Sequence, residues 1–193
     1  GHRLSYADGE LAYPQEKREV ILPRKAVLEL SRQLSSTDDT LDISIYAAQV
    51  RFHYGRSELV TKIIDGKFPD YTRVIPVNYG KTITLDRQVL LGSLQRAAIL
   101  SNEKFRGVRV NLADTEMRIT ANNPEQEEAE EMLDVTFEGD AIEIGFNVSY
   151  VLDVLNTLRC ENVRVSMSDA NASALIENAD DDSAMYVVMP IRL

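Results

Sequence analysis

The stretch Ile142-Glu-Ile-Gly-Phe-Asn-Val-Ser-Tyr-Val-Leu-Asp-Val-Leu-Asn-Thr-Leu158 decides the fold, because its hydrophobic period changes in the middle. Up to Phe146 apolar residues alternate along the chain, which is typical of a short strand. Beyond Asn147 they recur at helical spacing, and asparagine is favoured at a helix N-cap. We therefore expect a strand over 142–146 followed directly by a helix over 147–158. The predicted apolar face of that helix holds Val148, Val151, Leu155 and Leu158.

The same arrangement occurs twice earlier in the chain. A short strand at Thr82–Leu85 precedes a helical pattern over Asp86–Leu100, with Asp86 as N-cap. Another at Val20–Leu22 precedes a helical pattern over Pro23–Leu34, where proline suits the first turn. The helix starts are roughly 62 residues apart, which indicates a repeated unit of strand, helix and strands. The predicted apolar faces hold Leu90, Leu94 and Ala97 in one helix and Val27, Leu30 and Leu34 in the other.

Period-two alternation follows each helix and predicts half-buried antiparallel strands around 41–45, 50–54, 108–112 and 163–167. The pattern in residues 1–19 is irregular, and it contains Gly1, Gly9 and Pro14, which are residue types that interrupt helices and strands. An α+β fold follows. We place a domain boundary near Val77–Gly80, so that 1–76 form an incomplete domain and 77–193 a complete one.

The composition narrows the class of protein. The 193 residues are 44% hydrophobic with a net charge of −10, which predicts a globular chain that does not hold nucleic acid across its whole surface. Cys160 is the only cysteine, as expected in a reducing cytosol. No apolar run reaches the roughly 20 residues that span a bilayer, and no signal-like N-terminus is present. We expect a cytoplasmic location, and a fragment, because the chain does not begin with methionine.

No residue pattern predicts catalysis. The two histidines, His2 and His53, lie far apart, no cysteine or histidine spacing predicts zinc, and no glycine-rich loop follows a strand. The triplet Asp180–Asp182 is compatible with a divalent cation site but is more typical of a solvated hairpin turn. We expect a non-enzymatic protein without a cofactor. The alternative is a metal-dependent hydrolase or nuclease that uses these carboxylates.

Charge is distributed unevenly along the chain. The run Glu125–Glu131 is typical of a solvated acidic loop, or else forms a docking face for a basic partner. The predicted helices over Pro23–Leu34 and Asp86–Leu100 each carry more basic than acidic residues, although the chain as a whole is acidic. They either face a phosphate backbone or carry ordinary surface cations.

The C-terminus is unusually apolar. Tyr186–Val188 predicts a strand, Pro190 ends its pairing, and the chain nevertheless finishes on Ile191, Arg192 and Leu193. We expect this end to border a pocket. The proline-bounded segment Phe68–Pro76 is expected to connect domains and to form a wall of a groove.

Together these stretches resemble one family, the bacterial DNA polymerase III beta subunit, or sliding clamp. The resemblance covers nearly the whole chain and is weak in Ser5–Arg18 and in the loops after each helix. The matching stretches are Gly1–Leu4, Asp65–Tyr71, Arg96–Arg109, Ile119–Glu131, Glu143–Leu155 and Tyr186–Leu193.

The resemblance implies a DNA-clamp fold with antiparallel sheets outside and helices lining the inner face. In the family two three-domain subunits close head to tail into a ring around duplex DNA, confer processivity without catalysis, and dock polymerases, the clamp loader and repair proteins. This chain resembles the second half of the middle domain and all of the last domain. By this resemblance the longer protein is a homodimer and the present chain a monomer.

The resemblance also implies three sets of site residues. The hydrophobic cleft for partner peptides comprises Leu4, Pro69, Arg73, Val74, Asn147, Tyr150, Ser173, Val187, Met189, Pro190, Ile191 and Arg192. The residues facing DNA are Arg24, Lys25, Arg32, Arg87 and Arg96. The ring interface includes Ile99, Leu100, Gln126, Glu127, Glu128, Glu130 and Glu131.

Overall fold

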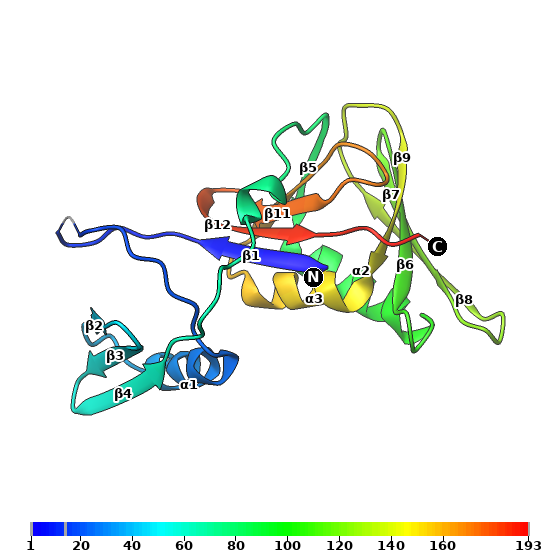
Figure 1. Cartoon of the computed structure of the whole chain (residues 1–193). Coiled ribbons are helices and arrows are strands. Elements are labelled where there is room, and N and C mark those ends of the chain that lie inside the picture. The colour runs from blue at the N-terminus through cyan, green and yellow to red at the C-terminus, as the bar shows by residue number, and fades with distance from the viewer. Residues whose placement is uncertain (1, 14, 193) are drawn as a thin grey trace. The chain divides into compact units, whose positions relative to one another are not determined.

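The computed structural model describes residues 2–13 and 15–192 (Figure 1). Three residues lie outside the described part of the chain: Gly1, Pro14 and Leu193. Gly1 and Pro14 are among the turn-forming residues noted in the N-terminal stretch, and Leu193 ends the apolar C-terminus. By packing, the chain falls into two compact units: Gly1–Glu10 together with Asp70–Leu193, and Leu11–Pro69. The N-terminal residues thus pack with the larger unit, whereas the sequence pattern places a domain boundary near residue 77.

The larger unit contains two copies of the predicted repeat. The first copy runs β5–α2–β6–β7–β8 and the second runs β9–α3–β10–β11–β12. Both helices begin at the predicted caps: Asp86 accepts a hydrogen bond from the Val89 N–H at 2.8 Å, and Asn147 accepts one from the Ser149 N–H at 3.0 Å. The bounds are β5 (Lys81–Asp86), α2 (Arg87–Ile99), β6 (Gly107–Ala113), β7 (Glu116–Asn122), β8 (Glu128–Asp134), β9 (Ile142–Asn147), α3 (Val148–Thr157), β10 (Asn162–Met167), β11 (Ala174–Asn178) and β12 (Asp181–Val188).

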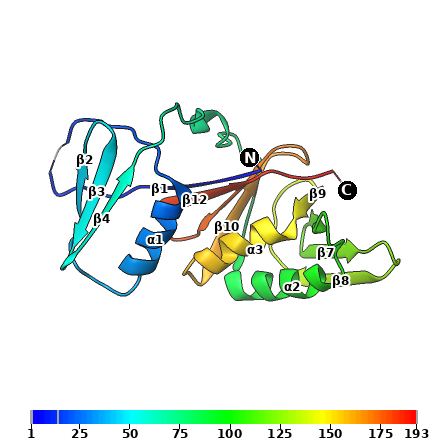
Figure 2. The same cartoon turned by 60° about the horizontal axis from the view of Figure 1, so that its bottom comes forward.

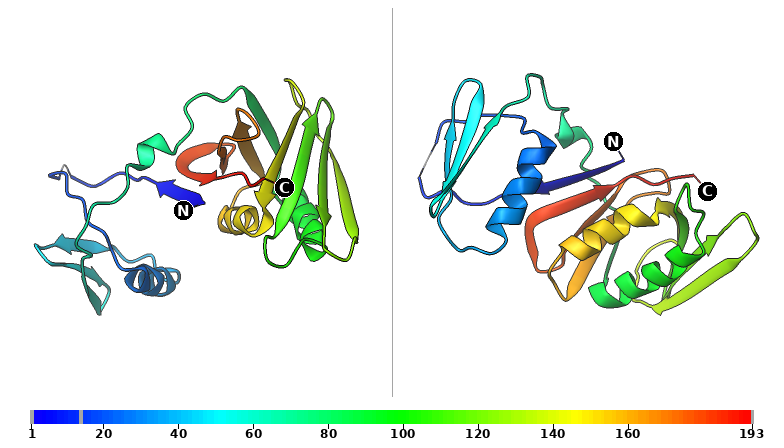
Figure 3. Two further views of the ribbon diagram at one scale, coloured as in Figure 1. Left: turned by 45° about the vertical axis from the view of Figure 1, so that its right-hand side comes forward. Right: turned by 90° about the horizontal axis from the view of Figure 1, so that it is seen from below.

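The two copies exchange their first strands. One antiparallel sheet has the order β8-β7-β6-β9, and the other has the order β1-β12-β11-β10-β5, where β1 is Arg3–Ala7. Each strand that precedes a helix therefore completes the sheet of the other copy. The symmetry is broken at the edges, because β1 covers the outer edge of β12 while β8 ends its sheet. Figure 2 and the right-hand view of Figure 3 show α2 and α3 running side by side.

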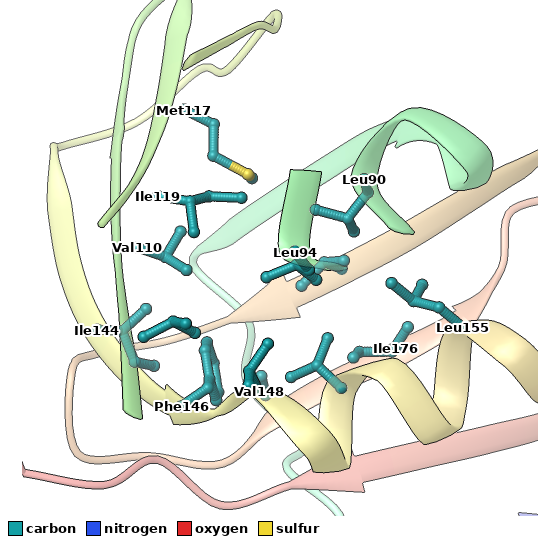
Figure 4. Packing of buried hydrophobic residues seen from close by; sticks show 14 of the residues in the cluster. Leu90, Leu94, Val110, Met117, Ile119, Ile144, Phe146, Val148, Leu155 and Ile176 are labelled. Atoms are coloured by element: carbon teal, nitrogen blue, oxygen red, sulfur yellow. The ribbon is translucent and has the colours of Figure 1, made fainter. Parts of the chain in front are cut away.

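The core of the larger unit lies between these two helices and the two sheets (Figure 4). Every helical residue that the second copy's pattern assigns to its apolar face is buried, and Val148 and Leu155 are fully buried. The alternating strands agree with the prediction as well, because Val108, Val110 and Leu112 in β6 face the core together. The candidate site described below lies on strands and on one helix that pack on this core.

The smaller unit is a single copy of the repeat. Helix α1 (Arg24–Leu34) packs against a sheet of order β2-β3-β4, with bounds Asp42–Ile45, Gln49–Tyr54 and Ser57–Lys62. Its core is small and centres on Leu30 and alternate residues of β3. Gly55, at φ +54°, supplies the left-handed conformation of the turn between β3 and β4.

The structure corrects several local predictions. Within the N-terminal stretch predicted to be irregular, residues 3–7 form β1, which pairs with β12, whereas residues 8–13 and 15–19 form no helix or strand. The strand expected at Val20–Leu22 is reduced to one bridge, Ile21 to Ile64. The helical spacing predicts that Val27 faces the core, but its side chain is 48% exposed and Ala26 is buried instead. The acidic run is a loop only in its first part, because Glu128–Glu131 belong to β8.

Candidate functional site

A row of apolar side chains crosses the outer face of the five-stranded sheet, on the side away from the core. Leu4 in β1 pairs with Val187 in β12, which pairs with Leu175 in β11. Neighbours in each strand, such as Val188 and Ile176, belong to the core, so alternation turns the row to the opposite face. Val187 and Leu175 are buried, whereas Leu4 is half-buried. The row thus forms a second apolar layer outside the main core, and Leu4 is its accessible end.

The connector after residue 69 lies against this outer face. It contains a 3₁₀ turn, η1 (Tyr71–Arg73), drawn as a short coil in Figure 3, left. The Tyr71 ring lies 5.8 Å from the Tyr6 ring of β1. Further along, the Tyr79 hydroxyl is buried without a hydrogen-bond partner in the described part of the chain. Burial raises the pKa of Tyr79, and the nearby carboxylate of Glu177 in β11 raises it further. The connector therefore packs beside the apolar row, through Tyr71 against Tyr6 and through Tyr79 near Glu177.

The C-terminal tail joins the two sheets of the larger unit. The Met189 N–H donates to the His2 carbonyl at 2.9 Å, and the Ile191 N–H donates to the Gly145 carbonyl of β9 at 2.8 Å. Pro190 lies between these two donors, at a position where the alternating pattern requires no N–H. Met189 remains 40% exposed and Ile191 is half-buried. The apolar end of the chain is therefore held by backbone bonds while its side chains stay accessible.

A hollow of about 460 Å³ opens beside this tail. Its residues come from the start of β1, the loop after α2, the strands β6, β7 and β9, the helix α3 and the tail. The lining residues are His2, Asn102, Lys104, Phe105, Gly107, Asn122, Asn147, Tyr150, Ile191 and Arg192.

The Asn147 side chain links the loop after α2 to the start of α3 beside this hollow. Its side-chain oxygen caps α3, and its amide nitrogen donates to the Phe105 carbonyl at 3.2 Å. The Val148 N–H donates to the Arg106 carbonyl at 2.7 Å, next to that contact. Both ends of the Asn147 amide are therefore occupied, and the residue fixes the loop after α2 against the start of α3.

Tyr150 is positioned by the start of β1. The His2 ring stacks on the Tyr150 ring with a centroid distance of 6.2 Å, and the Arg3 guanidinium carbon lies 4.6 Å from the Tyr150 ring centroid. Arg3 also forms an ion pair with Asp153, one turn further along α3. The N-terminal strand thus holds this aromatic ring at the edge of the hollow.

The structure brings most of the predicted cleft residues together. Leu4 and Val187 lie in the apolar row, Arg73 and Val74 lie in or next to η1, and Asn147, Tyr150, Ile191 and Arg192 line the hollow. Met189 and Pro190 connect the two groups. Ser173 directly precedes β11, one position beyond the pair of Ala174 with Val188. Pro69 ends the smaller unit, and Arg73 is exposed and paired with Asp70 at 3.0 Å.

Several residues at the site are absent from the predicted cleft set, because the sequence pattern gives no signal for them. Leu175 lies in a strand buried on both faces, so it shows no alternation. His2 lies two residues before Leu4, but a lone histidine near a chain end carries no signal. Lys104 and Phe105 lie in a loop, and only the exposure of Phe105, 60%, marks it in the structure.

The five basic residues predicted to face DNA differ in their surroundings. Arg24 and Lys25 are exposed at the start of α1, with no ion pair in the described chain. Arg32 pairs with Glu29 at 2.6 Å. The Arg87 guanidinium donates to the carbonyls of Leu155 and Cys160, both at 2.9 Å, near the end of α3, where a positive charge is favourable.

The fifth, Arg96, lies against the acidic strand β8. Its guanidinium donates two hydrogen bonds to Glu131, at 2.8 and 2.7 Å, and thereby lowers the pKa of that carboxyl. Another cation, Arg118 of β7, pairs with Glu116 at 3.1 Å and with Glu130 at 3.9 Å. Part of the acidic run is thus neutralised within the chain.

The predicted ring residues gather at one edge of the larger unit. Ile99 ends α2 and is 76% exposed, and Leu100 after it is half-buried. Helix α2 contacts β8, the edge strand that carries Glu128, Glu130 and Glu131. Gln126 and Glu127 lie between the turn at Pro124–Glu125 and β8, where the Glu127 N–H donates to the Asn123 side-chain oxygen at 3.0 Å. An exposed isoleucine and an open strand edge make this a surface suited to contact with another chain.

The candidate cation site is a hairpin. Ala179 and Asp180 form the turn between β11 and β12, and Asp181 and Asp182 begin β12. Within residues 2–13 and 15–192 no group of three or more histidine, cysteine, aspartate or glutamate residues is arranged to hold a metal ion. None of the helices in the described chain is long and apolar enough to cross a membrane.

Comparison with known proteins gives consistent matches. The family model for the DNA polymerase III beta subunit, C-terminal domain, matches residues 72–192, and the model for its central domain matches residues 1–70. The beta sliding clamp of Vibrio cholerae serotype O1 is 61% identical over 193 residues, which are 100% of this chain and 53% of that protein.

Solved structures agree with these matches. The DNA polymerase sliding clamp from Pseudomonas aeruginosa with ligand has a TM-score of 0.96 and 48% identity, covering 100% of this chain and 53% of that one. A sliding clamp from the same species bound to griselimycin has a TM-score of 0.95 and 48% identity, covering 100% of this chain and 52% of that one. The chain spans about half the length of the relatives it matches.

Proposed function

Because the chain belongs to the family of the bacterial DNA polymerase III beta subunit, the sliding clamp, we propose that it forms the partner-docking part of such a clamp. Residues 1–76 then correspond to the C-terminal half of the middle domain and 77–193 to the last domain. The longer protein encircles duplex DNA as a head-to-tail homodimer and confers processivity without catalysis. Its location is the cytoplasm, and its partners are polymerase subunits, the clamp loader and repair proteins.

The apolar row Leu4–Val187–Leu175 supports docking most directly. It lies on an outer sheet face, it has a wall formed by the connector after residue 69, and it continues through Met189 to the hollow beside Ile191. A short extended peptide with apolar side chains could bury them along this surface, each contributing about 1.5–3 kcal/mol. The surrounding backbone groups are already bonded, so the surface is preformed.

We expect replacement of both Leu4 and Met189 by alanine to weaken binding of a short peptide that contains leucine and phenylalanine by about 10- to 100-fold. Both side chains are accessible, so their truncation removes contact area with little loss of folded protein. Isothermal titration calorimetry with a clamp-binding peptide of a polymerase measures the change. Met132→Ala, an exposed methionine on β8, serves as the matched control and should leave the affinity unchanged.

Two results would contradict the docking proposal. One is the absence of detectable binding at high micromolar peptide. The other is an unchanged dissociation constant after the double replacement.

For DNA, we propose contact without sequence preference through the basic helix residues, of which Arg24 and Lys25 have no ion pair in the described chain. Outside a closed ring nothing holds the duplex topologically, so a few cations on a chain of net charge −10 should bind it weakly. The acidic remainder of the chain would keep DNA away from other surfaces.

We expect duplex binding by this chain to fall steeply with salt and to weaken further when Arg24 and Lys25 are replaced by glutamine. Each lost phosphate contact should reduce the slope of log affinity against log salt by about 0.9. Fluorescence anisotropy of a labelled duplex at several salt concentrations measures both effects. Lys62→Gln, at an exposed position of β4, is the control. Tight binding that resists salt would contradict the proposal.

A further inference from the structure

One acidic residue of the edge strand β8 points to the opposite face of the sheet from its acidic neighbours. In the register of β7 and β8, Glu131 lies opposite Ile119, whose side chain is fully buried, and Glu130 lies opposite Thr120. Residues directly opposite each other share a face, so Glu131 lies on the core side and Glu130 on the outer side. Their side chains are 21% and 47% exposed. A carboxylate on the core side of a sheet is costly unless it is paired.

Arg96 of α2 supplies that partner. Helix α2 lies against β8 (Figure 2). The Arg96 guanidinium donates to both oxygens of the Glu131 carboxylate, from Nε to Oε1 at 2.8 Å and from Nη2 to Oε2 at 2.7 Å. Nη2 also donates to the hydroxyl of the buried Ser93 at 3.0 Å, and a bidentate contact of this kind fixes the orientation of both side chains. Among the ion pairs in the described part of the chain, only this one joins α2 to β8.

The residue one helical turn before Arg96 leaves room for its guanidinium. A Cβ atom at Gly92 would lie 3.3 Å from Nη1 of Arg96, which is closer than an ordinary contact between such atoms. Glycine in a helix interior lowers stability relative to alanine, and Gly92 lies within α2. What this glycine supplies is therefore space, because a large side chain here would compete with the guanidinium of Arg96 for the same position.

The contact has a consequence for the sheet because β8 has a neighbouring strand on one side only. It pairs with β7, and its other edge is unpaired in the described residues. A strand held by one ladder is released from its sheet more easily than an inner strand. The bidentate contact with α2 gives β8 a second attachment, which comes from the helix layer and leaves the open edge uncovered.

We propose that Arg96 is a positioning residue of the assembly edge: it holds Glu131 against α2 and so keeps β8 in the extended conformation with which a strand of a second chain can pair. This role rests on the proposed head-to-tail ring, and it replaces contact of Arg96 with DNA. Because Glu131 is directed toward α2, the outward-facing Glu128 and Glu130 remain to face the partner chain.

The surroundings of Arg96 favour this role over contact with a phosphate backbone. A phosphate would have to displace a carboxylate that already accepts two hydrogen bonds, and the negative charge of Glu131 would repel it. Arg24 and Lys25, by contrast, form no ion pair in the described chain. Arg96 therefore adds little net positive charge to the surface of its helix.

Hydrogen exchange of the β8 amides in the 193-residue chain tests whether Arg96 holds the strand. We expect Arg96→Gln to speed this exchange about 10-fold, because it leaves the Glu131 carboxylate unpaired on the core side. Adding Glu131→Gln removes that charge and should recover most of the protection, since both replacements act on one contact. Arg109→Gln is the matched control, because this arginine pairs with Glu143 at 3.3 Å in strands that do not contact β8.

Sedimentation of the longer protein that contains this chain, with fluorescence detection, tests the effect on assembly. We expect Arg96→Gln to raise the dissociation constant of its homodimer about 10-fold and the added Glu131→Gln to reverse most of that rise. If Glu131 bonded the partner chain directly, the double replacement would stay weak. In fluorescence anisotropy with a labelled duplex, Arg96→Gln in the 193-residue chain should leave the salt dependence of binding unchanged.

The contrary outcomes can be told apart. Unchanged exchange of β8 after Arg96→Gln would show that Arg96 does not hold the strand. Faster exchange with an unchanged homodimer, or a homodimer that the double replacement leaves weak, would show that it does not position the edge. A salt slope reduced by about 0.9 would make Arg96 a DNA contact. If the longer protein does not form a homodimer, the proposed ring fails and this role of Arg96 fails with it.

Discussion

Replacing Leu155 by alanine should lower the free energy of unfolding of the larger unit by about 2–5 kcal/mol. Leu155 is fully buried in α3 and belongs to the core cluster that also contains Leu90, Leu94 and Ile176 (Figure 4). Truncation removes the transfer free energy of its side chain and leaves a cavity, and the surrounding helices and strands cannot relax fully into it. A loss of this size is a large fraction of the stability of an ordinary domain.

Urea unfolding followed by far-ultraviolet circular dichroism measures the change, because the chain has no tryptophan. The two compact units need not unfold together, so hydrogen exchange of the α3 amides should assign the loss to the larger unit. Val89→Ala, an exposed position in α2, is the matched control and should change the stability by less than about 0.5 kcal/mol. A loss at Leu155 no greater than the control's would show that the core is misplaced.

The helices of the larger unit could be predicted because two independent signals coincide there. At Asp86 and Asn147 a capping side chain stands where the hydrophobic period changes, and both side chains accept the expected backbone hydrogen bond. The smaller unit lacks such a cap, since Pro23 occupies the N-cap of α1 without a side-chain bond. The apolar spacing still predicts its helix, but it places Val27 on the buried face, where the structure has Ala26.

The remaining features depend on partners that are distant in sequence. Strand β1 exists because Leu4 and its neighbours pair with β12, about 180 residues away, and alternation over five residues is too short a signal alone. The acidic residues of β8 form a strand because β7 provides the ladder and because Arg96 and Arg118 neutralise part of the charge. The sequence leaves Arg87 either facing DNA or as an ordinary surface cation, and only the fold shows that its guanidinium donates to the carbonyls of Leu155 and Cys160. No local pattern reports such contacts.

A comparison of the two sheets of the larger unit indicates which sheet edge could pair with a strand of a second chain. They are equivalent in topology, and β1 covers the outer edge of β12 in one of them. The corresponding edge in the other sheet is β8, whose outer side is unpaired in the described residues. The exposed Ile99 lies at the end of α2, which packs against the same strand. An added strand with basic neighbours would satisfy the edge, cover Ile99 and face Glu128 and Glu130.

We expect the 193-residue chain to sediment as a monomer of 21.7 kDa at low micromolar concentration and to form a complex when the separately made first domain of the same protein is added. A head-to-tail contact is heterologous, so the β8 edge is not complementary to its own copy, and two acidic edges repel each other. The complex should weaken with salt and disappear after replacement of Ile99 and Leu100 by alanine, whereas Val77→Ala, at a highly exposed position, should leave it intact. Analytical ultracentrifugation decides between the alternatives. A stable homodimer that survives the double replacement would show that this edge is not the ring interface.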